Sequence, residues 1–333
     1  MNIEKRVLTG IQASGDLHIG NYLGAIKPAI ELGKQAKNHN MFIADYHALN
    51  STKDRERLGM AIKRIASTYL AAGIDPSHSI LYRQSDVPEI FEITTILANF
   101  TPKGFMNKAH SYKARVDKNV EAGLPNDDGI NMGLYVYPIL MAADILAFDA
   151  TDVPVGKDQI QHVEIARDIA GAFNAIYGEN TLIQPECIVK ESVGIIPGVD
   201  GRKMSKSYNN VIPILGTDAE IKKAIFSIKT DSRPMEEPKD AEELLIYQIF
   251  KTFAPLDKVL EMKEGLAQGK LGYGHIKNML LDAVLLELKE VREKSEYYMN
   301  NYHEVEEILC EGSFKARKIA AKTLDRLKNR IFA

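Results

Sequence analysis

Residues 8–21 have the sequence LTGIQASGDLHIGN, in which an apolar run leads through three glycines into a helix-like segment. This order predicts the end of a β-strand, a tight turn and the start of a helix. Gly10, Gly15 and Gly20 let the backbone approach a ligand without a clash from a Cβ atom. The free amides at the start of the helix favour an anion. Such a turn is common in α/β proteins, but its polar side chains are not needed for packing and favour a nucleotide site.

The chain around this turn alternates short β-type runs with amphipathic stretches. We predict strands at 6–8, 41–45 and 79–83, and helices at 21–37 and 51–72. This alternation implies a parallel sheet with helices on both faces, which is a Rossmann-like α/β fold. Ligands of such sheets bind at the carboxyl ends of the strands, where the glycine turn lies.

A second polar cluster, Lys203-Met204-Ser205-Lys206-Ser207, places two lysines around a serine in a loop with glycine and aspartate nearby. Most lysine clusters are solvated surface loops. Lysine ammonium groups and hydroxyls are also the groups that bind the negatively charged phosphates of a triphosphate. Together with the glycine turn, the cluster therefore predicts ATP chemistry.

Strand patterns disappear beyond about residue 217. We therefore predict two domains, a Rossmann-like domain over residues 1–216 and an α-helical domain over residues 217–333. Helices of the second domain are predicted at 219–228, 241–253, 259–266, 274–299, 304–310 and 314–331. The last of these is strongly basic, which is typical of a charged surface helix or of a nucleic-acid contact.

Residues 99–134 differ from the rest of the first domain and are interpreted as an insertion between the two halves of the sheet. They combine a basic stretch at 103–118 with a loop at 124–129. Lys113 and Arg115 of this stretch could reach a phosphate across the cleft, contact a nucleic acid or form a solvated face. The sequence leaves these three alternatives open.

Composition indicates an ordinary globular protein: 333 residues, 45% hydrophobic and 26% charged, with a net charge of −3. A nucleic-acid partner would therefore have to be met by local basic patches. The two cysteines, Cys187 and Cys310, do not have metal-ligand spacing, so we expect no metal site built from the protein. The first residues lack an apolar signal segment, and we expect a cytoplasmic protein.

Asp144 is the most unusual single residue, because it lies in the apolar segment LMAADIL at 140–146. An unpaired carboxylate in a protein core would be strongly disfavoured. The residue is therefore part of a structural salt bridge, exposed at a helix end, or an acceptor for a ligand donor.

The two motifs resemble the signatures of the class I aminoacyl-tRNA synthetases, His-Ile-Gly-His and Lys-Met-Ser-Lys-Ser. Residues 203–207 match the second signature completely, whereas Asn21 replaces the last histidine of the first. This variant is typical of the branch that activates tryptophan and tyrosine. The segments YPILMAADIL (137–146) and VPVGKDQ (153–159) resemble the tryptophan-activating members, and the resemblance extends over essentially the whole chain.

The resemblance implies that the protein activates L-tryptophan with ATP and transfers it to the terminal adenosine of tRNA(Trp). Mg²⁺ would be held mainly by the phosphates, the helical domain would bind the anticodon, and the insertion could form a homodimer. A tyrosyl-tRNA synthetase is the first alternative, although the segment MAAD (141–144) favours indole. A small nucleotidyltransferase and a tRNA-binding relative without catalysis are less well supported, because the long helical tail and the two intact motifs speak against them.

The resemblance also assigns roles to residues. It assigns the neutralisation of the phosphate charge to His18, Lys203 and Lys206. Asp144 is expected to accept the indole N–H, which is a donor only. Further tryptophan contacts are expected from Met141, Gln159, His47 and Tyr137, although Met141 and His47 could equally be ordinary core residues. ATP contacts are expected from Gln12, Ala13 (where the family usually has proline), Ser14, Gly20, Asn21, Gly156, Lys157, Asp158, Ile195, Lys203, Met204, Ser205, Lys206 and Ser207.

Overall fold

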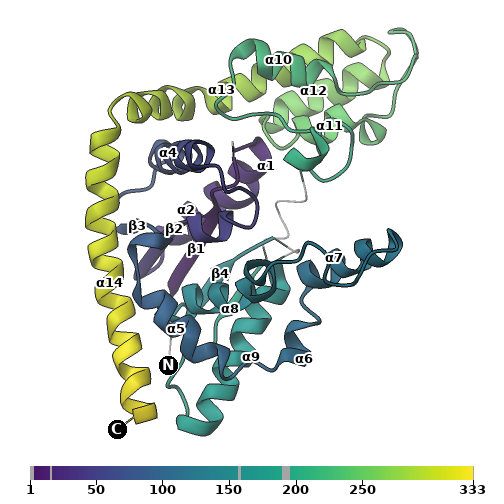
Figure 1. Cartoon of the computed structure of the whole chain (residues 1–333). Helices are drawn as coiled ribbons and strands as arrows, with labels where there is room; N and C mark the ends of the chain where they lie inside the picture. The colour runs from purple at the N-terminus through teal and green to yellow at the C-terminus, as the bar shows by residue number, and fades with distance from the viewer. Residues whose placement is uncertain (1–3, 16, 157–158, 190–195, 333) are drawn as a thin grey trace.

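The computed structural model describes residues 4–15, 17–156, 159–189 and 196–332. Its centre is one sheet of five parallel strands in the order β3-β2-β1-β4-β5 (Figure 1). The strands are β1 Arg6–Gln12, β2 Asn38–Ala44, β3 Ser79–Arg83, β4 Asp152–Pro154 and β5 Glu186–Ile188. The predicted Rossmann-like fold is confirmed, and β1 and β2 are longer than predicted.

The register of the sheet brings the carboxyl ends of the central strands together. Gln12 at the end of β1 lies opposite Ala44 at the end of β2. Ile43 of β2 lies opposite Arg83, the last residue of β3. Residues 39–44 of β2 are all buried, as expected for a strand of a parallel sheet that is covered on both faces.

The helix predicted at 21–37 is divided into three segments: α1 Ile19–Asn21, the π-helical turn η1 Tyr22–Ile26 and α2 Lys27–Gly33. Pro28 lies early in α2 and has no N–H, and its ring crowds the carbonyl of residue 24. This explains the wider turn that precedes it. The helix predicted at 51–72 is α4 Arg55–Ala71, which is capped by the Asp54 side chain.

Most of the chain between β2 and β5 forms helices in addition to α4. They are α3 Asp45–Ala48, α5 Glu89–Ala98, α6 Lys103–Met106, α7 His110–Glu121, α8 Met132–Leu146 and α9 Ile160–Tyr177. Helix α8 packs against α5 and α9, and α7 projects away from the sheet (Figure 1). The predicted insertion therefore corresponds to α6, α7 and the loop before α8.

The C-terminal part is helical, as predicted. Its elements are α10 Asp218–Phe226, the short η5 Ala241–Glu243, α11 Leu245–Phe250, α12 Leu256–Ala267, α13 Tyr273–Asn300 and α14 Tyr302–Phe332. The prediction of two helices at 304–310 and 314–331 is wrong, because α14 continues through Gly312. This glycine does not end the helix but lets it approach a strand: a Cβ atom there would lie 1.8 Å from the Leu81 carbonyl oxygen.

Helix α14 leaves α10–α13 and runs along the β3 edge of the sheet, beside α5 (Figure 1, yellow). Part of its positive charge is neutralised there: Arg317 pairs with Glu89 at 2.9 Å, and Lys328 pairs with Glu92. The boundary near residue 217 stays a prediction, and α14 belongs spatially with the sheet.

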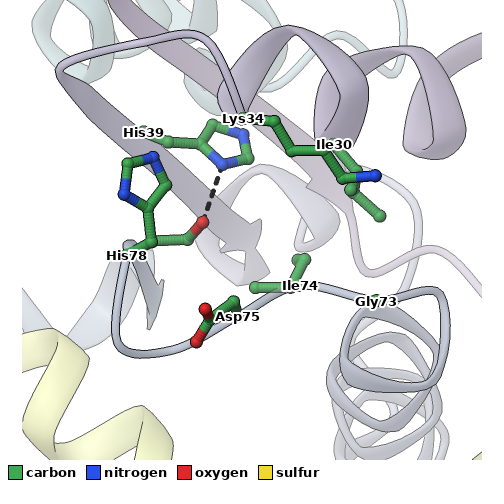
Figure 2. Close-up of a pocket in the computed structure, with 8 residues that line it drawn as sticks. Ile30, Lys34, His39, Gly73, Ile74, Asp75 and His78 are labelled. Atoms are coloured by element: carbon green, nitrogen blue, oxygen red, sulfur yellow. Dashed lines mark hydrogen bonds between the residues drawn. The ribbon is translucent and has the colours of Figure 1, made fainter.

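A cavity of about 290 Å³ opens at the amino ends of β2 and β3 (Figure 2). Inside it, His39 Nδ1 lies 2.8 Å from Ser79 Oγ. Because ligands of parallel sheets bind at the carboxyl ends, this cavity is at the opposite edge from the glycine turn. Among the described residues, no helix is long and apolar enough to cross a membrane.

Replacing Gly312 by alanine tests the docking of α14. We expect Gly312→Ala to lower the free energy of unfolding by about 1–3 kcal/mol, because the helix and β3 must separate to admit the Cβ atom. Urea denaturation measures the change. The control is Gly59→Ala in α4, where a Cβ atom meets nothing within 4 Å; there alanine should stabilise the helix by up to about 1 kcal/mol. An unchanged urea midpoint in Gly312→Ala would contradict the close contact.

Candidate active site

The glycine turn follows β1 directly. Gly15 has a φ of +112°, which a residue with a Cβ atom rarely adopts. Ala13 is fully buried in the core. The Gln12 side chain donates to the His47 carbonyl and to Ser51 Oγ, at 3.0 Å each, and thereby ties the turn to α3 and the following loop.

The polar residues of the first motif organise the start of α1. The backbone N–H of His18 donates to Asn21 Oδ1 at 3.1 Å, so the Asn21 side chain closes the first helical turn. Gly20 lies against His18 and Met204: a Cβ atom there would be 3.0 Å from His18 Nδ1 and 3.5 Å from Met204 Sδ. The two motifs are thus in contact through Gly20.

A short antiparallel pairing joins the two motif regions. The Ile19 N–H donates to the Ile212 carbonyl at 3.0 Å, and the Ile214 N–H donates to the Leu17 carbonyl at 3.2 Å. His18 and Pro213 form the isolated bridge between them. The segment that follows the lysine cluster is therefore held beside the glycine turn.

The lysine cluster leads into the short helix η4 Lys206–Tyr208. Lys206 Nζ lies 3.4 Å from the Ser14 carbonyl oxygen, so it reaches across to the glycine turn. Met204 is buried, whereas Lys203 and Lys206 are exposed. The structure thus brings His18, Ser14, Lys206 and Met204, which lie far apart in the sequence, into one region.

Asn210 shapes the lysine cluster and was missed by the sequence analysis. Its side chain is buried; Oδ1 accepts from the Ser205 N–H at 2.7 Å, and Nδ2 donates to the Lys203 carbonyl at 3.1 Å and to Asp200 Oδ1 at 2.7 Å. The only signal was an asparagine pair directly after the cluster, which is also typical of a solvated loop.

The electrostatics of this region favour an anion. Burial, and then the charges of Lys206 and Lys203, lower the pKa of His18 to about 4. The imidazole is therefore neutral at neutral pH and lies beside two ammonium groups. Its buried Nδ1 has no hydrogen-bond partner among the described residues. No group of three or more His, Cys, Asp or Glu that could hold a metal ion occurs in the part of the chain that the structure describes.

A second polar group lies deeper, around Asp144 on α8. The carboxylate is fully buried and accepts from His47 Nε2 at 2.9 Å and from Gln84 Nε2 at 2.9 Å to each oxygen. Burial raises the pKa of the Asp144 carboxyl, and the hydrogen bonds from His47 and Gln84 oppose the rise. Gln84 was missed, although its position after the third predicted strand, at the carboxyl end of the sheet, could have indicated it.

Tyr137, Met141 and Asp144 lie one or two turns apart on α8 and share a face. The Tyr137 ring meets His47 edge to face, with centroids 6.0 Å apart. Its hydroxyl lies 2.6 Å from Ser111 Oγ and 2.7 Å from His162 Nε2. Four of the predicted tryptophan contacts, namely Tyr137, Met141, Asp144 and His47, are thus close together.

The remaining candidates lie near β4 and α9. The Gln159 N–H donates to the Gly156 carbonyl at 2.9 Å, and Gln159 directly precedes α9. Lys157, Asp158 and Ile195 lie outside the described residues. Their predicted ATP contacts stay predictions.

Several known proteins are similar to this chain. A tryptophan–tRNA ligase of Bordetella parapertussis is 46% identical over 328 residues, which is 98% of this chain and 72% of the relative. The crystal structure of a tryptophanyl-tRNA synthetase from Campylobacter jejuni, complexed with ADP and tryptophan, has a TM-score of 0.88 at 46% identity and covers 98% of this chain and 100% of that one. A tyrosyl-tRNA synthetase structure from Archaeoglobus fulgidus, at 19% identity and a TM-score of 0.64, covers 88% of this chain and 90% of its own and shows the same fold.

The sequence model of one family, described as tRNA synthetases class I (W and Y), matches residues 2–289. This match covers most of the chain and includes both motif regions, the Asp144 group and α8. The chain therefore belongs to the W and Y family of class I tRNA synthetases.

Proposed function

We propose that this chain is a tryptophan–tRNA ligase, which activates L-tryptophan with ATP and transfers it to tRNA(Trp). The proposal rests above all on the pairing of residues 17–19 with residues 212–214, which keeps His18 beside Lys203 and Lys206. Its support from comparisons is that the curated relatives at 44–46% identity are tryptophan–tRNA ligases. The Campylobacter jejuni structure contains ADP and tryptophan, which supports both small substrates.

In the first step, an oxygen of the tryptophan carboxylate bonds to the α-phosphorus of ATP. The bond from this phosphorus to the bridging oxygen of the β-phosphate breaks, and pyrophosphate leaves with the electron pair. The protein forms no covalent bond; it positions the reactants and neutralises the charge of the leaving group. Lys203 and Lys206 supply the positive charge for this neutralisation, and the neutral imidazole of His18 contributes as a hydrogen-bond donor to the phosphates.

The glycine turn and the lysine cluster line the ATP. Mg²⁺ would be held mainly by the phosphates, whose charge it would help to neutralise. The indole ring lies near Met141 and Tyr137, with its N–H toward Asp144. Gln159 contacts the amino or carboxylate group of the amino acid.

In the second step, a ribose hydroxyl of the terminal adenosine of tRNA(Trp) attacks the acyl carbon, and AMP leaves. The exposed basic residues of α7 are available for the tRNA backbone, and the insertion at 99–134 is available for a homodimer. Tyrosine specificity is less well supported, because the tyrosyl-tRNA synthetases are 16–19% identical and share only the fold.

Pyrophosphate exchange with each amino acid tests the function and the role of Asp144. Wild type should exchange with tryptophan alone, and exchange with tyrosine instead would contradict the proposal. A pocket that pairs with the indole N–H can favour tryptophan over phenylalanine by a factor of about 10⁴–10⁵ in kcat/KM. Asp144→Ala should lower the ratio of kcat/KM for tryptophan to kcat/KM for phenylalanine. The KM for ATP should stay nearly unchanged. Asp168→Ala, at an exposed position on α9, is the control.

The charge of Lys206 should matter most when pyrophosphate begins to leave. We expect Lys206→Ala to slow adenylate formation by about 10²–10³, as for the loss of one preorganised donor. Tryptophan binding should change little. Single-turnover activation measures the rate, with the exposed Lys229→Ala as the control. If the single-turnover rate of the variant stayed within a few-fold of wild type, Lys206 would not have this role.

The titration of His18 tests the electrostatic contact between the motifs. NMR of the ligand-free protein should give His18 a pKa of about 4. Lys206→Ala removes a like charge that disfavours the imidazolium, so the pKa should rise; because burial remains the larger cause, it should stay below the usual value of about 6.5. Lys229→Ala should have no effect. If Lys206→Ala left the titration unchanged, the two motifs would not be electrostatically coupled.

A further inference from the structure

We infer that Gln84 is a specificity-determining positioning residue: its side-chain amide holds the Asp144 carboxylate in the orientation that receives the indole N–H. The inference rests on the proposed function, because it assumes that Asp144 faces tryptophan. Gln84 itself does not need to touch the substrate. It acts through Asp144.

The place of Gln84 is fixed by strand β3, which ends at the preceding residue. Arg83 is held by two acids: its guanidinium donates to Glu306 of α14 at 2.6 and 3.1 Å and to Asp86 at 2.8 Å. Ser313 of α14 also donates to Asp86, at 3.0 Å. The backbone around Gln84 is therefore anchored on both sides of the residue.

The orientation of the Gln84 amide is determined by its neighbours. The Tyr46 N–H is a donor only and lies 3.2 Å from Gln84 Oε1. The carbonyl end of the amide must therefore face Tyr46, and the NH₂ end must face Asp144. Gln84 is fully buried, so no water competes for either end.

The hydrogen-bond acceptor positions of the Asp144 carboxylate can be counted one by one. A carboxylate has about four acceptor positions. Gln84 occupies one on each oxygen, and His47 occupies a further one on Oδ2. One acceptor position remains for a substrate donor. Because Gln84 contacts both oxygens, it prevents the carboxylate from rotating. Such a rotation would move the remaining acceptor position away from the substrate donor.

The surroundings of Asp144 make this amide important. Apart from His47, the titratable groups near the carboxylate are Asp45 at the start of α3, whose charge raises the pKa of Asp144, and Tyr82 of β3, whose own pKa is raised by burial and by the charge of Asp144. Asp45 has its own donors, Ser85 Oγ and the Ser85 N–H. Gln84 is thus the neutral donor that keeps the Asp144 carboxylate paired on both oxygens.

The test is the nearly isosteric variant Gln84→Glu. Its carboxyl group can still accept from the Tyr46 N–H, but it replaces the NH₂ donor by an oxygen that faces Asp144. Two adjacent carboxyl groups cannot both ionise easily, so the pair shares a proton at low pH. The protonated Glu side chain then donates to Asp144 as Gln84 does. At higher pH this proton is lost, and the carboxylates repel each other.

We therefore expect kcat/KM for tryptophan to approach the wild-type value at low pH and to fall at least about tenfold as the pH rises through the upper apparent pKa of the pair. The fall should appear in the KM for tryptophan and not in the KM for ATP. Gln248→Glu in α11, whose side chain donates only to the Glu242 carbonyl, is the matched control and should keep the wild-type profile.

A swap separates positioning from a merely structural role. The double variant Gln84→Glu with Asp144→Asn has one carboxyl group and one amide, so the additional pH dependence should disappear. Gln84→Met lacks both polar ends and should raise the KM for tryptophan equally at all pH values. Thermal unfolding shows whether each variant is folded.

The inference is overturned if folded Gln84→Glu has the wild-type KM and pH profile, or if the double variant keeps the additional pH dependence. It is also overturned if Gln84→Glu loses activity equally toward tryptophan and ATP at every pH. Failure of the proposed function looks different, because wild type itself would then not exchange with tryptophan.

Discussion

The active region depends on the backbone pairing between residues 17–19 and residues 212–214. The glycine turn comes from the sheet, whereas the lysine cluster comes from the end of the same α/β region almost two hundred residues later. The glycine turn contains no lysine or arginine, so the positive charge for a triphosphate comes from the lysine cluster. Two backbone hydrogen bonds and the contact of Gly20 with Met204 bring the parts together. Burial is the larger cause of the low pKa of His18, and the charges of Lys206 and Lys203 lower it further.

Much of this arrangement could be predicted from the sequence, because local patterns carry it. Gly10, Gly15 and Gly20 mark the turn, and the strand at 79–83 was predicted with its observed bounds. Asp144 was recognised because a carboxylate in an apolar helix needs a partner. The resemblance then added the identity of the amino acid and the order of the two steps. In each case the decisive signal lies within a few adjacent residues.

The features that were missed depend on contacts between distant segments. Gln84 and Asn210 are polar residues with nothing unusual in their neighbours, and only the folded chain shows that both amides are buried and hydrogen-bonded. Gly312 gave a misleading signal, because a glycine within a helical pattern is more often a stop than a site of close approach. A glycine is needed at position 312 because the helix lies against the Leu81 carbonyl, which is more than two hundred residues earlier in the sequence.

The docking of α14 on β3 has a consequence for biosynthesis. An uncovered edge strand offers unpaired backbone groups to other chains, and folded proteins protect such edges by covering them. Here the cover is α14, which is synthesised more than two hundred residues after β3. One of its hydrogen bonds, from Ser313 to Asp86, joins positions 227 residues apart. The nascent chain therefore carries an open sheet edge while the residues between β3 and α14 are synthesised. Exposed strand edges of this kind make partly folded chains prone to aggregation. Helix α14, which holds Arg83 and Asp86 beside Gln84, also ends this exposure.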